Sequence, residues 1–246
     1  NKDYMAELKF PTEQVELPSK GLIYPKESPL SSGIVEMKYM TAKEEDILTN
    51  QAFIKKGIVL DKLLRSLVVS KDVNIDDLIV GDKNAILIAS RLLGYGAEYT
   101  FTYGGEQHTV DLNELDNKPL DESNFTQGVN EFEYTLPTSK TKITYKLITG
   151  RDEKAIEREI AGLKKINKDA SPELTTRLKQ AILSVDGDSE KKTVREFVDN
   201  YLLAKDSRAL REHIRLTQPD VDMNIVLDSG EEVTVPIGLS FFWPDY

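Results

Sequence analysis

The chain contains no cysteine, and it has only two histidines and one tryptophan among its 246 residues. The absence of cysteine excludes disulfides, thiolate zinc sites, iron–sulfur clusters and a catalytic thiol. The histidines, His108 and His213, are far apart in the sequence. A metal site that uses them would therefore need the fold to bring both histidines together and carboxylates to supply the remaining ligands. Cysteine and histidine chemistry contribute little to the candidate functions.

Positive charge is also in deficit, with 32 Lys and Arg against 42 Asp and Glu and a formal net charge of −10. Such a chain repels the phosphate backbone of a nucleic acid unless it carries a local basic patch. The clustered lysines lie beside expected helix ends or on polar faces, which is typical of a solvated surface. They are Lys164, Lys165, Lys168, Lys191 and Lys192. We therefore expect no nucleic-acid partner.

Long apolar runs are absent as well. The densest apolar stretch, residues 85–93, is interrupted by Ser90 and Arg91. It has about half of the roughly 20 residues that a bilayer span requires. The first residues include Asp3 and Glu7 and lack the basic and apolar stretches of a secretion signal. We expect no membrane partner and a cytoplasmic location.

Alternation and helical spacing divide the sequence into strands and helices. The length allows one large domain or two modest ones. Period-2 alternation and turn residues predict strands over 34–40, 99–103, 107–112, 131–136, 142–147, 223–227 and 232–237. Apolar spacing and capping residues predict helices over 41–52, 60–69, 82–93, 149–166, 171–185, 193–202 and 206–216. The expected caps are Thr41, Asp82, Thr149, Ser171, Thr193 and Asp206.

The predicted fold class is α+β, with β-hairpins combined with an α-helical block. We predict an N-terminal α+β region over residues 1–148 that contains an arm and hairpins. A helical region follows over residues 149–218. A C-terminal β-hairpin and aromatic tail, residues 219–246, are expected to pack on the N-terminal region.

No motif for phosphate, dinucleotide, metal or nucleophile chemistry is present. Gly94-Tyr-Gly96 follows a helix and lacks a third glycine, so it indicates a turn from helix to strand. The acidic spacing from Asp220 to Glu231 copies a calcium loop, but Ile225 stands where that loop needs glycine. We predict no cofactor and no metal. Spacing alone leaves open a pair of catalytic carboxylates, since acid–base catalysis depends on burial and approach.

The two ends of the chain carry its most distinctive side chains. The last six residues hold four aromatics, which are costly to expose and enriched at interface anchors. Residues 10–25 contain three prolines between short apolar patches, which favours an ordered arm. The candidate partner-binding residues are Phe10, Leu17, Leu22, Tyr24, Phe241, Phe242, Trp243 and Tyr246. Burial in the core of the same chain is the alternative for both ends.

Four segments resemble the baseplate hub assembly proteins of T-even-type, contractile-tailed bacteriophages and related tail-assembly proteins. They are Leu17-Pro-Ser-Lys-Gly-Leu-Ile-Tyr-Pro25, Val35-Glu-Met-Lys-Tyr-Met-Thr-Ala-Lys-Glu-Glu45, Arg91-Leu-Leu-Gly-Tyr-Gly96 and Phe241-Phe-Trp-Pro244. Members of that family often carry Cys-x-x-Cys pairs in their hairpin turns. This chain has Tyr103-Gly-Gly-Glu106 and Asp228-Ser-Gly-Glu231 there. The resemblance therefore implies degenerate zinc-ribbon-like hairpins without zinc, held by apolar packing.

The same resemblance implies a non-enzymatic protein that acts by protein–protein contact in the host cytoplasm. It would be a component of the baseplate hub or an assembly factor for the hub and tail. Its expected partners are other phage tail and baseplate hub proteins, and self-association is left open, as is retention in the virion baseplate. The alternatives are a cytoplasmic enzyme that uses carboxylates from the two β regions, and a tail assembly chaperone unrelated to the hub.

Overall fold

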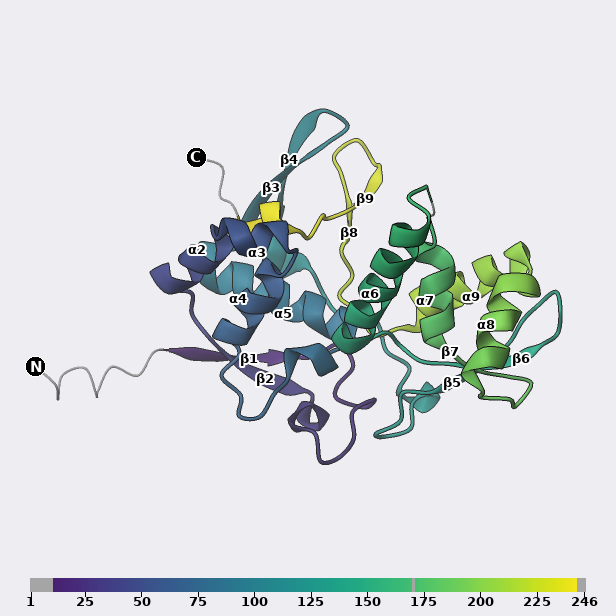
Figure 1. Ribbon diagram of the computed structural model, residues 1–246. Helices are drawn as coiled ribbons and strands as arrows, with labels where there is room; N and C mark the ends of the chain where they lie inside the picture. The colour runs from purple at the N-terminus through teal and green to yellow at the C-terminus, as the bar shows by residue number, and fades with distance from the viewer. Residues whose placement is uncertain (1–10, 170, 243–246) are drawn as a thin grey trace, which may run out of the picture. The chain divides into compact units, whose positions relative to one another are not determined.

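A computed structural model of the chain describes residues 11–169 and 171–242. The chain divides into two units that are compact in themselves. Unit 1 comprises Asn1–Ile75, Gly81–Gly128 and Pro219–Tyr246, and unit 2 comprises Asp76–Val80 and Val129–Gln218. Figure 1 follows the chain through both. The α+β class that the sequence predicts is confirmed, because helices combine with small antiparallel sheets in the described residues.

Unit 1 begins with a two-stranded sheet and a group of helices. Its first elements are β1 (Thr12–Glu16), the 3-10 helix η1 (Pro29–Ser32), β2 (Ile34–Lys38), α2 (Ala42–Leu48), α3 (Gln51–Lys55) and α4 (Val59–Leu67). α5 (Val80–Tyr95) enters unit 1 at Gly81 after the 3-10 helix η2 (Ile75–Asp77). Side chains on β2 and α4 are fully buried, namely Val35, Met37, Leu63, Leu64 and Leu67. These helices therefore pack with the inner face of the sheet.

Two further hairpins complete unit 1. The first joins β3 (Glu98–Tyr103) to β4 (Glu106–Asp111), and the second joins β8 (Asn224–Val226) to β9 (Glu232–Thr234). Three short 3-10 helices accompany them, η3 (Leu112–Glu114), η4 (Glu122–Asn124) and η5 (Leu239–Phe242). Tyr103 Oη donates to Glu231 Oε1 at 2.7 Å and so links the two hairpins. The C-terminal segment thus belongs to the same unit as the N-terminal region.

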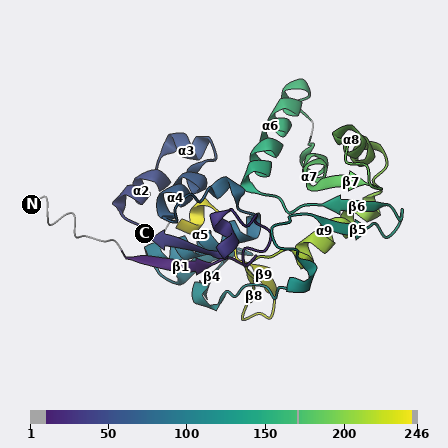
Figure 2. The same cartoon turned by 90° about the horizontal axis from the view of Figure 1, so that it is seen from below.

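Unit 2 is built on a three-stranded antiparallel sheet in the order β5-β6-β7, which Figure 2 shows with its helices. Its elements are β5 (Phe132–Thr135), β6 (Lys142–Tyr145), α6 (Gly150–Ile166), α7 (Glu173–Ala181), β7 (Ile182–Val185), α8 (Lys191–Asn200) and α9 (Ala204–Thr217). The boundary before Val129 differs from the expected boundary at residue 148. The reason is that β7, from the helical block, pairs with β6.

The hairpins that open the two units have the same register. Glu16 pairs with Ile34 in unit 1, and Thr135 pairs with Lys142 in unit 2. In both units the first strand is followed by Leu-Pro and then a hydroxyl residue, Leu17-Pro-Ser19 and Leu136-Pro-Thr138. The second strand is followed in both by Lys-x-x-Thr and a capped helix, at 38–41 and at 146–149.

The chain also returns to the sheet at the same place in both units. After α4, Val68 pairs with Met37. After α7, Ile182 pairs with Tyr145, which stands at the corresponding position of β6. The return is a single bridge in unit 1 and the strand β7 in unit 2. We call this arrangement of paired strands, capped helix, second helix and return to the sheet the repeated core, residues 12–70 in unit 1 and 132–185 in unit 2. The molecule therefore contains one arrangement twice, with the two additional hairpins only in unit 1 among the described residues.

Several predicted helix bounds are wrong. The predicted helix over 171–185 ends at Ala181, because the next four residues form β7. The predicted helix over 41–52 breaks at Asn50, whose side chain accepts from Ala52 N and Phe53 N and starts α3. α8 begins before Thr193, so Thr193 does not cap it. Asp82 and Asp206 likewise lie inside the first turns of α5 and α9, not at caps.

Candidate functional site

Asp82 is the polar centre of unit 1. Its side chain is fully buried and accepts hydrogen bonds from Ser19 N at 2.9 Å, Ser19 Oγ at 2.6 Å and Tyr24 Oη at 2.6 Å. Burial raises the pKa of Asp82 and nearby Asp220 adds to the increase, although the hydrogen bonds act in the opposite direction. A carboxyl group in the first turn of α5 thus fixes the segment that the sequence analysis singles out as an arm.

Residues 12–16 of the predicted arm form β1, and the remaining residues 17–25, which we call the arm from here on, form a tight loop. Gly21 has a φ of 75°, and a Cβ there would lie 2.6 Å from Gly33 N. Gln127 Nε2 donates to Gly21 O at 3.2 Å, and Gly128 N donates to Leu22 O at 2.7 Å. Only glycine fits position 21, since any side chain would meet backbone and strain the turn. The arm is therefore held on both sides within unit 1.

A groove of about 450 Å³ lies beside the arm in unit 1. It is lined by Glu16, Leu17, Pro18, Lys20, Ser32, Gly33, Ile34, Asn117, Lys118, Pro119 and Leu120. Leu17 and Pro18 are buried, and the Ile34 side chain is 39% exposed. Glu16 and Lys20 are exposed at the rim, and Lys20 Nζ pairs with Glu122 Oε1 at 2.5 Å. An apolar base with a charged rim fits an apolar segment of a partner.

The structure places the predicted contact residues mainly in the core of unit 1. Leu17 and Tyr24 are buried, and Leu22 is half-buried. Phe241 and Phe242 are also buried, and the Phe241 ring lies 4.8 Å from that of Tyr99 in an edge contact. This is the core alternative that the sequence left open. We therefore withdraw the four buried side chains as direct contact residues.

The other predicted contact residues, Phe10, Trp243 and Tyr246, lie outside the described residues. The sequence analysis missed Ile34 and residues 117–120 of the groove. Its only signal was the apolar pair Pro119 and Leu120 within an acidic, turn-rich stretch. Residues so far apart in the sequence give no periodic pattern from which a shared groove could be predicted.

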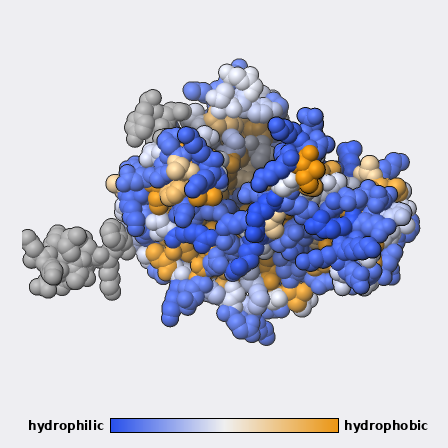
Figure 3. Space-filling view, in the orientation of Figure 1, coloured by the Kyte–Doolittle hydropathy of each residue, from blue (hydrophilic) through white to orange (hydrophobic). Residues whose placement is uncertain are grey.

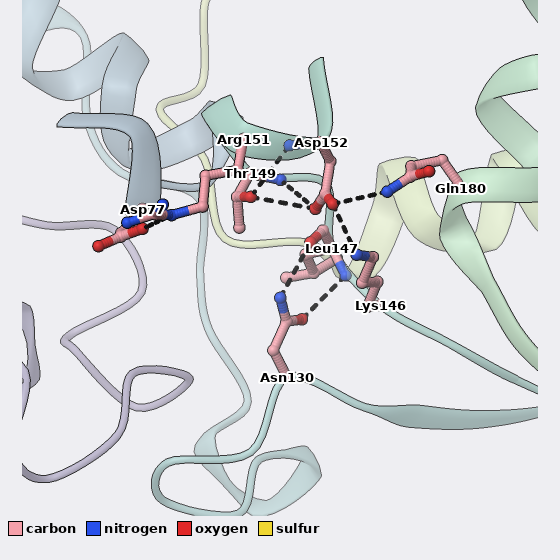
Figure 4. Close-up of polar contacts among 8 residues, drawn as sticks. All are labelled: Asp77, Asn130, Lys146, Leu147, Thr149, Arg151, Asp152 and Gln180. Carbon is pink, nitrogen blue, oxygen red and sulfur yellow. Dashed lines mark hydrogen bonds and ion pairs between the residues drawn. The ribbon is translucent and has the colours of Figure 1, made fainter. Parts of the chain in front are cut away.

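A second polar cluster, in unit 2, surrounds Asp152 (Figure 4). Asp152 Oδ1 accepts from Lys146 Nζ at 2.6 Å and from Gln180 Nε2 at 2.9 Å. Its Oδ2 accepts from the backbone N and Oγ1 of Thr149, both at 3.0 Å. Burial acts to raise the pKa of Asp152, but Lys146 and these hydrogen bonds outweigh it and hold the pKa below its usual value.

The residues around this cluster fix the start of α6 (Figure 4). Asn130 makes two hydrogen bonds to the backbone of Leu147. Its Oδ1 accepts from Leu147 N and its Nδ2 donates to Leu147 O, both at 2.9 Å. Arg151 pairs with Asp77, and Lys154 Nζ pairs with Asp76 Oδ1 at 2.7 Å. These contacts tie Asp152, Lys146, Gln180 and the start of α6 together within unit 2.

Glu44 in unit 1 is held like Asp152, by a lysine, by the N-cap threonine and by one further side-chain donor. Its Oε1 accepts from Lys38 Nζ at 2.8 Å and Ser66 Oγ at 2.6 Å, and its Oε2 accepts from Thr41 N at 2.9 Å and Oγ1 at 2.7 Å. Burial opposes ionisation, but the hydrogen bonds lower the pKa of Glu44 to about 2. The predicted capping boxes at Thr41 and Thr149 are confirmed, and each has a lysine and a second donor.

Asp206 is the counterpart of Asp82 in unit 2. It lies in the first turn of α9, is fully buried, and accepts from Thr138 N at 2.7 Å and Ser139 N at 2.9 Å. Burial acts against its charge, but these backbone donors lower the pKa of Asp206. Ser19 and Thr138 each follow a Leu-Pro pair. Both carboxyl groups thus hold the turn after the first strand of the repeated core.

The remaining motifs have local structural roles. Residues 224–226 of the calcium-like segment form β8, and Asp220 Oδ1 accepts from Asn84 Nδ2 at 3.1 Å. Among residues 11–169 and 171–242, no group of three or more histidine and carboxylate side chains is placed to hold a metal ion. None of the helices in these ranges is both long and apolar enough to cross a membrane.

No family model, no curated protein and no solved structure matches this chain.

Proposed function

We propose that the protein acts by protein–protein contact, and that the groove beside the arm of unit 1 receives an apolar segment of its partner. We further propose that it serves contractile-tailed bacteriophages as a baseplate hub component or as an assembly factor for the hub and tail. One observation carries the proposal. The segment at 17–25, which bears the family resemblance, is fixed by a buried carboxylate beside a groove that it helps to line.

The groove has the chemistry of a contact site. Its volume of about 450 Å³ is within the range of sites that enclose a ligand or an anchoring side chain. Ile34, Pro119 and the half-buried Leu120 supply accessible apolar surface, while Glu16 and Lys118 supply charges of both signs. Apolar anchors provide most of the affinity at such interfaces, and rim charges mainly set orientation and specificity.

The walls of the groove are already fixed before a partner binds. Leu17 N donates to Gly33 O at 2.8 Å, and Lys118 N donates to Asp220 O at 2.9 Å, so both walls are tied by backbone hydrogen bonds. A rigid site loses little conformational entropy when a partner docks. Asp82 therefore supports contact indirectly, by fixing the wall at 17–20.

The test is binding of the full chain to purified hub and tail proteins of a contractile-tailed phage. We expect Ile34→Asp to weaken capture of a hub protein by about tenfold or more, because it places a charge in the apolar groove. Val226→Asp is the matched control, since Val226 is 72% exposed on β8 of the same unit. Equal capture by both variants, or no capture by the unaltered chain, would contradict the proposal.

Mass spectrometry of purified virions separates the two forms of the proposal. A component of the hub is expected in stoichiometric amounts in the particle. An assembly factor is expected in infected-cell complexes and absent from the particle.

A further inference from the structure

The last turns of α6 in unit 2 are exposed on all sides. Every residue from 161 to 169 is exposed, although Ile156 earlier in α6 is buried. Ile166 is 87% exposed and Leu163 is 36% exposed, and Leu174 at the start of α7 is 44% exposed. Figure 3 shows apolar side chains among hydrophilic ones where α6 ends. We call Leu163, Ile166 and Leu174 the α6 tip.

The fold of unit 2 does not require this apolar surface. In the repeated core of unit 1 the corresponding helix, α2, stops at Leu48, and Asn50 starts the separate short helix α3. Phe53 and Ile54 on α3 are half-buried there. α6 instead continues to Ile166. Isolated exposed apolar residues are ordinary, but here two lie three residues apart at the end of α6 and a third lies at the start of α7, which makes them a candidate contact surface.

Gly162 supports the same interpretation. It lies inside α6, where glycine costs about 1 kcal/mol relative to alanine. A Cβ at this position would meet no atom within 4 Å, so no packing inside the protein explains it. Glycine on an exposed helix surface lets the backbone of another helix approach closely. It stands four residues before Ile166, on the same side of α6.

Charge identifies the kind of partner. Lys164, Lys165 and Lys168 lie in or just after the last turn of α6, and Asp169 is next in the sequence. Lys164 Nζ pairs with Glu173 Oε1 at 2.6 Å, so Lys165 and Lys168 are the charges that the α6 tip offers to a partner. Lysines near a helix C-terminus are favoured by the helix dipole, which accounts for their placement but not for the apolar side chains between them. A second copy of the chain would bring these lysines together in a symmetric contact, and they would repel.

We infer that the α6 tip docks an amphipathic helix of a partner protein whose apolar stripe is flanked by acidic residues. Leu163 and Ile166 would pack with its apolar side chains, and Lys165 and Lys168 would face its carboxylates. This deepens the proposed function, on which it rests only for the idea that the partner is a protein. It assigns unit 2 a second contact surface, separate from the groove of unit 1.

The test uses the full chain and a labelled, alanine-based helical peptide of about 20 residues with leucine along one face and glutamate beside it. A second peptide carries lysine at every glutamate position. By fluorescence anisotropy we expect the acidic peptide to bind about tenfold more tightly than the basic one. Ile166→Ser and Lys165→Glu should each weaken binding of the acidic peptide by about tenfold.

Two controls separate this surface from the rest of the molecule. Leu216→Ser removes another exposed apolar side chain of unit 2, 64% exposed at the end of α9, and should leave the affinity unchanged. Ile34→Asp in the groove should also leave it unchanged, so the two sites can fail separately. Ile166→Ser should not disturb folding, because the side chain it alters is almost wholly exposed.

Four results would overturn the inference. The first is no binding of the acidic peptide, and the second is equal binding of the basic one. The third is self-association of the chain that Ile166→Ser abolishes. The fourth is binding to phosphatidylserine vesicles that Ile166→Ser abolishes, which would make the α6 tip a membrane contact.

Discussion

Asp82 in unit 1 and Asp206 in unit 2 hold corresponding turns, yet their pKa values shift in opposite directions. Their hydrogen-bond donors differ in part. Asp82 accepts from one backbone N–H and two hydroxyl groups, whereas Asp206 accepts from two backbone N–H groups, and the side chains of Thr138 and Ser139 also act to lower its pKa. A hydroxyl can also accept a hydrogen bond, so it tolerates a protonated carboxyl, but a backbone N–H cannot. At Asp82, burial together with Asp220 outweighs the hydrogen bonds, whereas at Asp206 the hydrogen bonds outweigh burial.

The helices that carry these two acids also differ in how much of their surface is buried. α5 buries Leu87, Ile88 and Ser90, and the corresponding part of α9 carries the exposed residues Arg211 and Glu212. Among the described residues, the β3–β4 and β8–β9 hairpins occur only in unit 1. α5 is thus buried in the unit that carries the additional hairpins, while α9 has a polar, exposed outer face.

The largest effect is expected from Gly81→Ala. A Cβ at this position would lie 1.9 Å from Pro219 O and 2.8 Å from Asp220 Cα, so the C-terminal segment must move. Alanine in a helix normally stabilises by about 1 kcal/mol relative to glycine. Here we expect a loss of about 3 kcal/mol in the free energy of unfolding, measured by urea denaturation.

The matched control is Lys205→Ala, because Lys205 precedes Asp206 in α9 as Gly81 precedes Asp82 in α5. Lys205 is exposed, so its substitution should change the stability by less than about 0.5 kcal/mol. Equal losses of stability in the two variants would contradict the claim that the close contact at Gly81, and not its place in the helix, causes the effect.

The next effect sharpens the contrast between the two acids. Asp206→Asn leaves one backbone N–H, that of Thr138 or Ser139, facing an amide NH₂, and we expect a loss of about 2 kcal/mol. Asp82→Asn can keep its bonds if the hydroxyls of Ser19 and Tyr24 turn to accept, so about 1 kcal/mol or less is expected. Hydrogen exchange read by mass spectrometry reports the opening of each unit in the full chain. A larger loss for Asp82→Asn would contradict the donor argument.

The smallest effect is the pH dependence that His213 gives to unit 2. His213 on α9 stacks on Tyr134 with ring centroids 4.3 Å apart and meets the edge of Tyr145 at 5.9 Å. Burial lowers the pKa of His213 from its ordinary value of 6.5. The unfolded chain therefore binds a proton more readily than the folded one, and stability falls as the pH drops below 6.5 toward the folded pKa.

We expect hydrogen exchange in unit 2, corrected for intrinsic rates, to become faster as the pH falls from about 7.5 to about 5.5. His213→Phe keeps the ring and removes the titration, so it should remove this increase. The reference is unit 2 of that variant, because the buried Asp82 gives unit 1 a pH dependence of its own. A pH response that persists in His213→Phe would assign it to another group.

Local patterns predict local structure well in this chain. Alternation identifies the hairpins, and the Thr41 and Thr149 capping boxes form as predicted. Asp82 and Asp206 were predicted to be caps because aspartate before an apolar helix usually is. Their actual donors lie 63 and 68 residues away. Pairing of β7 with β6 joins residues 40 apart, such as Thr144 and Ser184, so a helical pattern over 171–185 does not reveal the strand.

The candidate sites differ in how far the sequence predicts them. The arm was predicted as a contact segment, but its apolar side chains Leu17 and Tyr24 point into the core, and the groove emerges only with residues 117–120 in place. For Phe241 and Phe242, composition cannot separate a core from an interface, since both bury aromatic rings. The α6 tip was hidden within an amphipathic pattern whose last two apolar positions happen to be uncovered.

The most direct test of protein contact through the groove is photo-crosslinking during infection, with a photoreactive amino acid replacing Ile34 in one sample and Val226 in another. The account predicts that position 34 crosslinks to a baseplate hub or tail protein and that position 226 does not. Crosslinks from position 34 only to its own chain, or the same products from both positions, would contradict it.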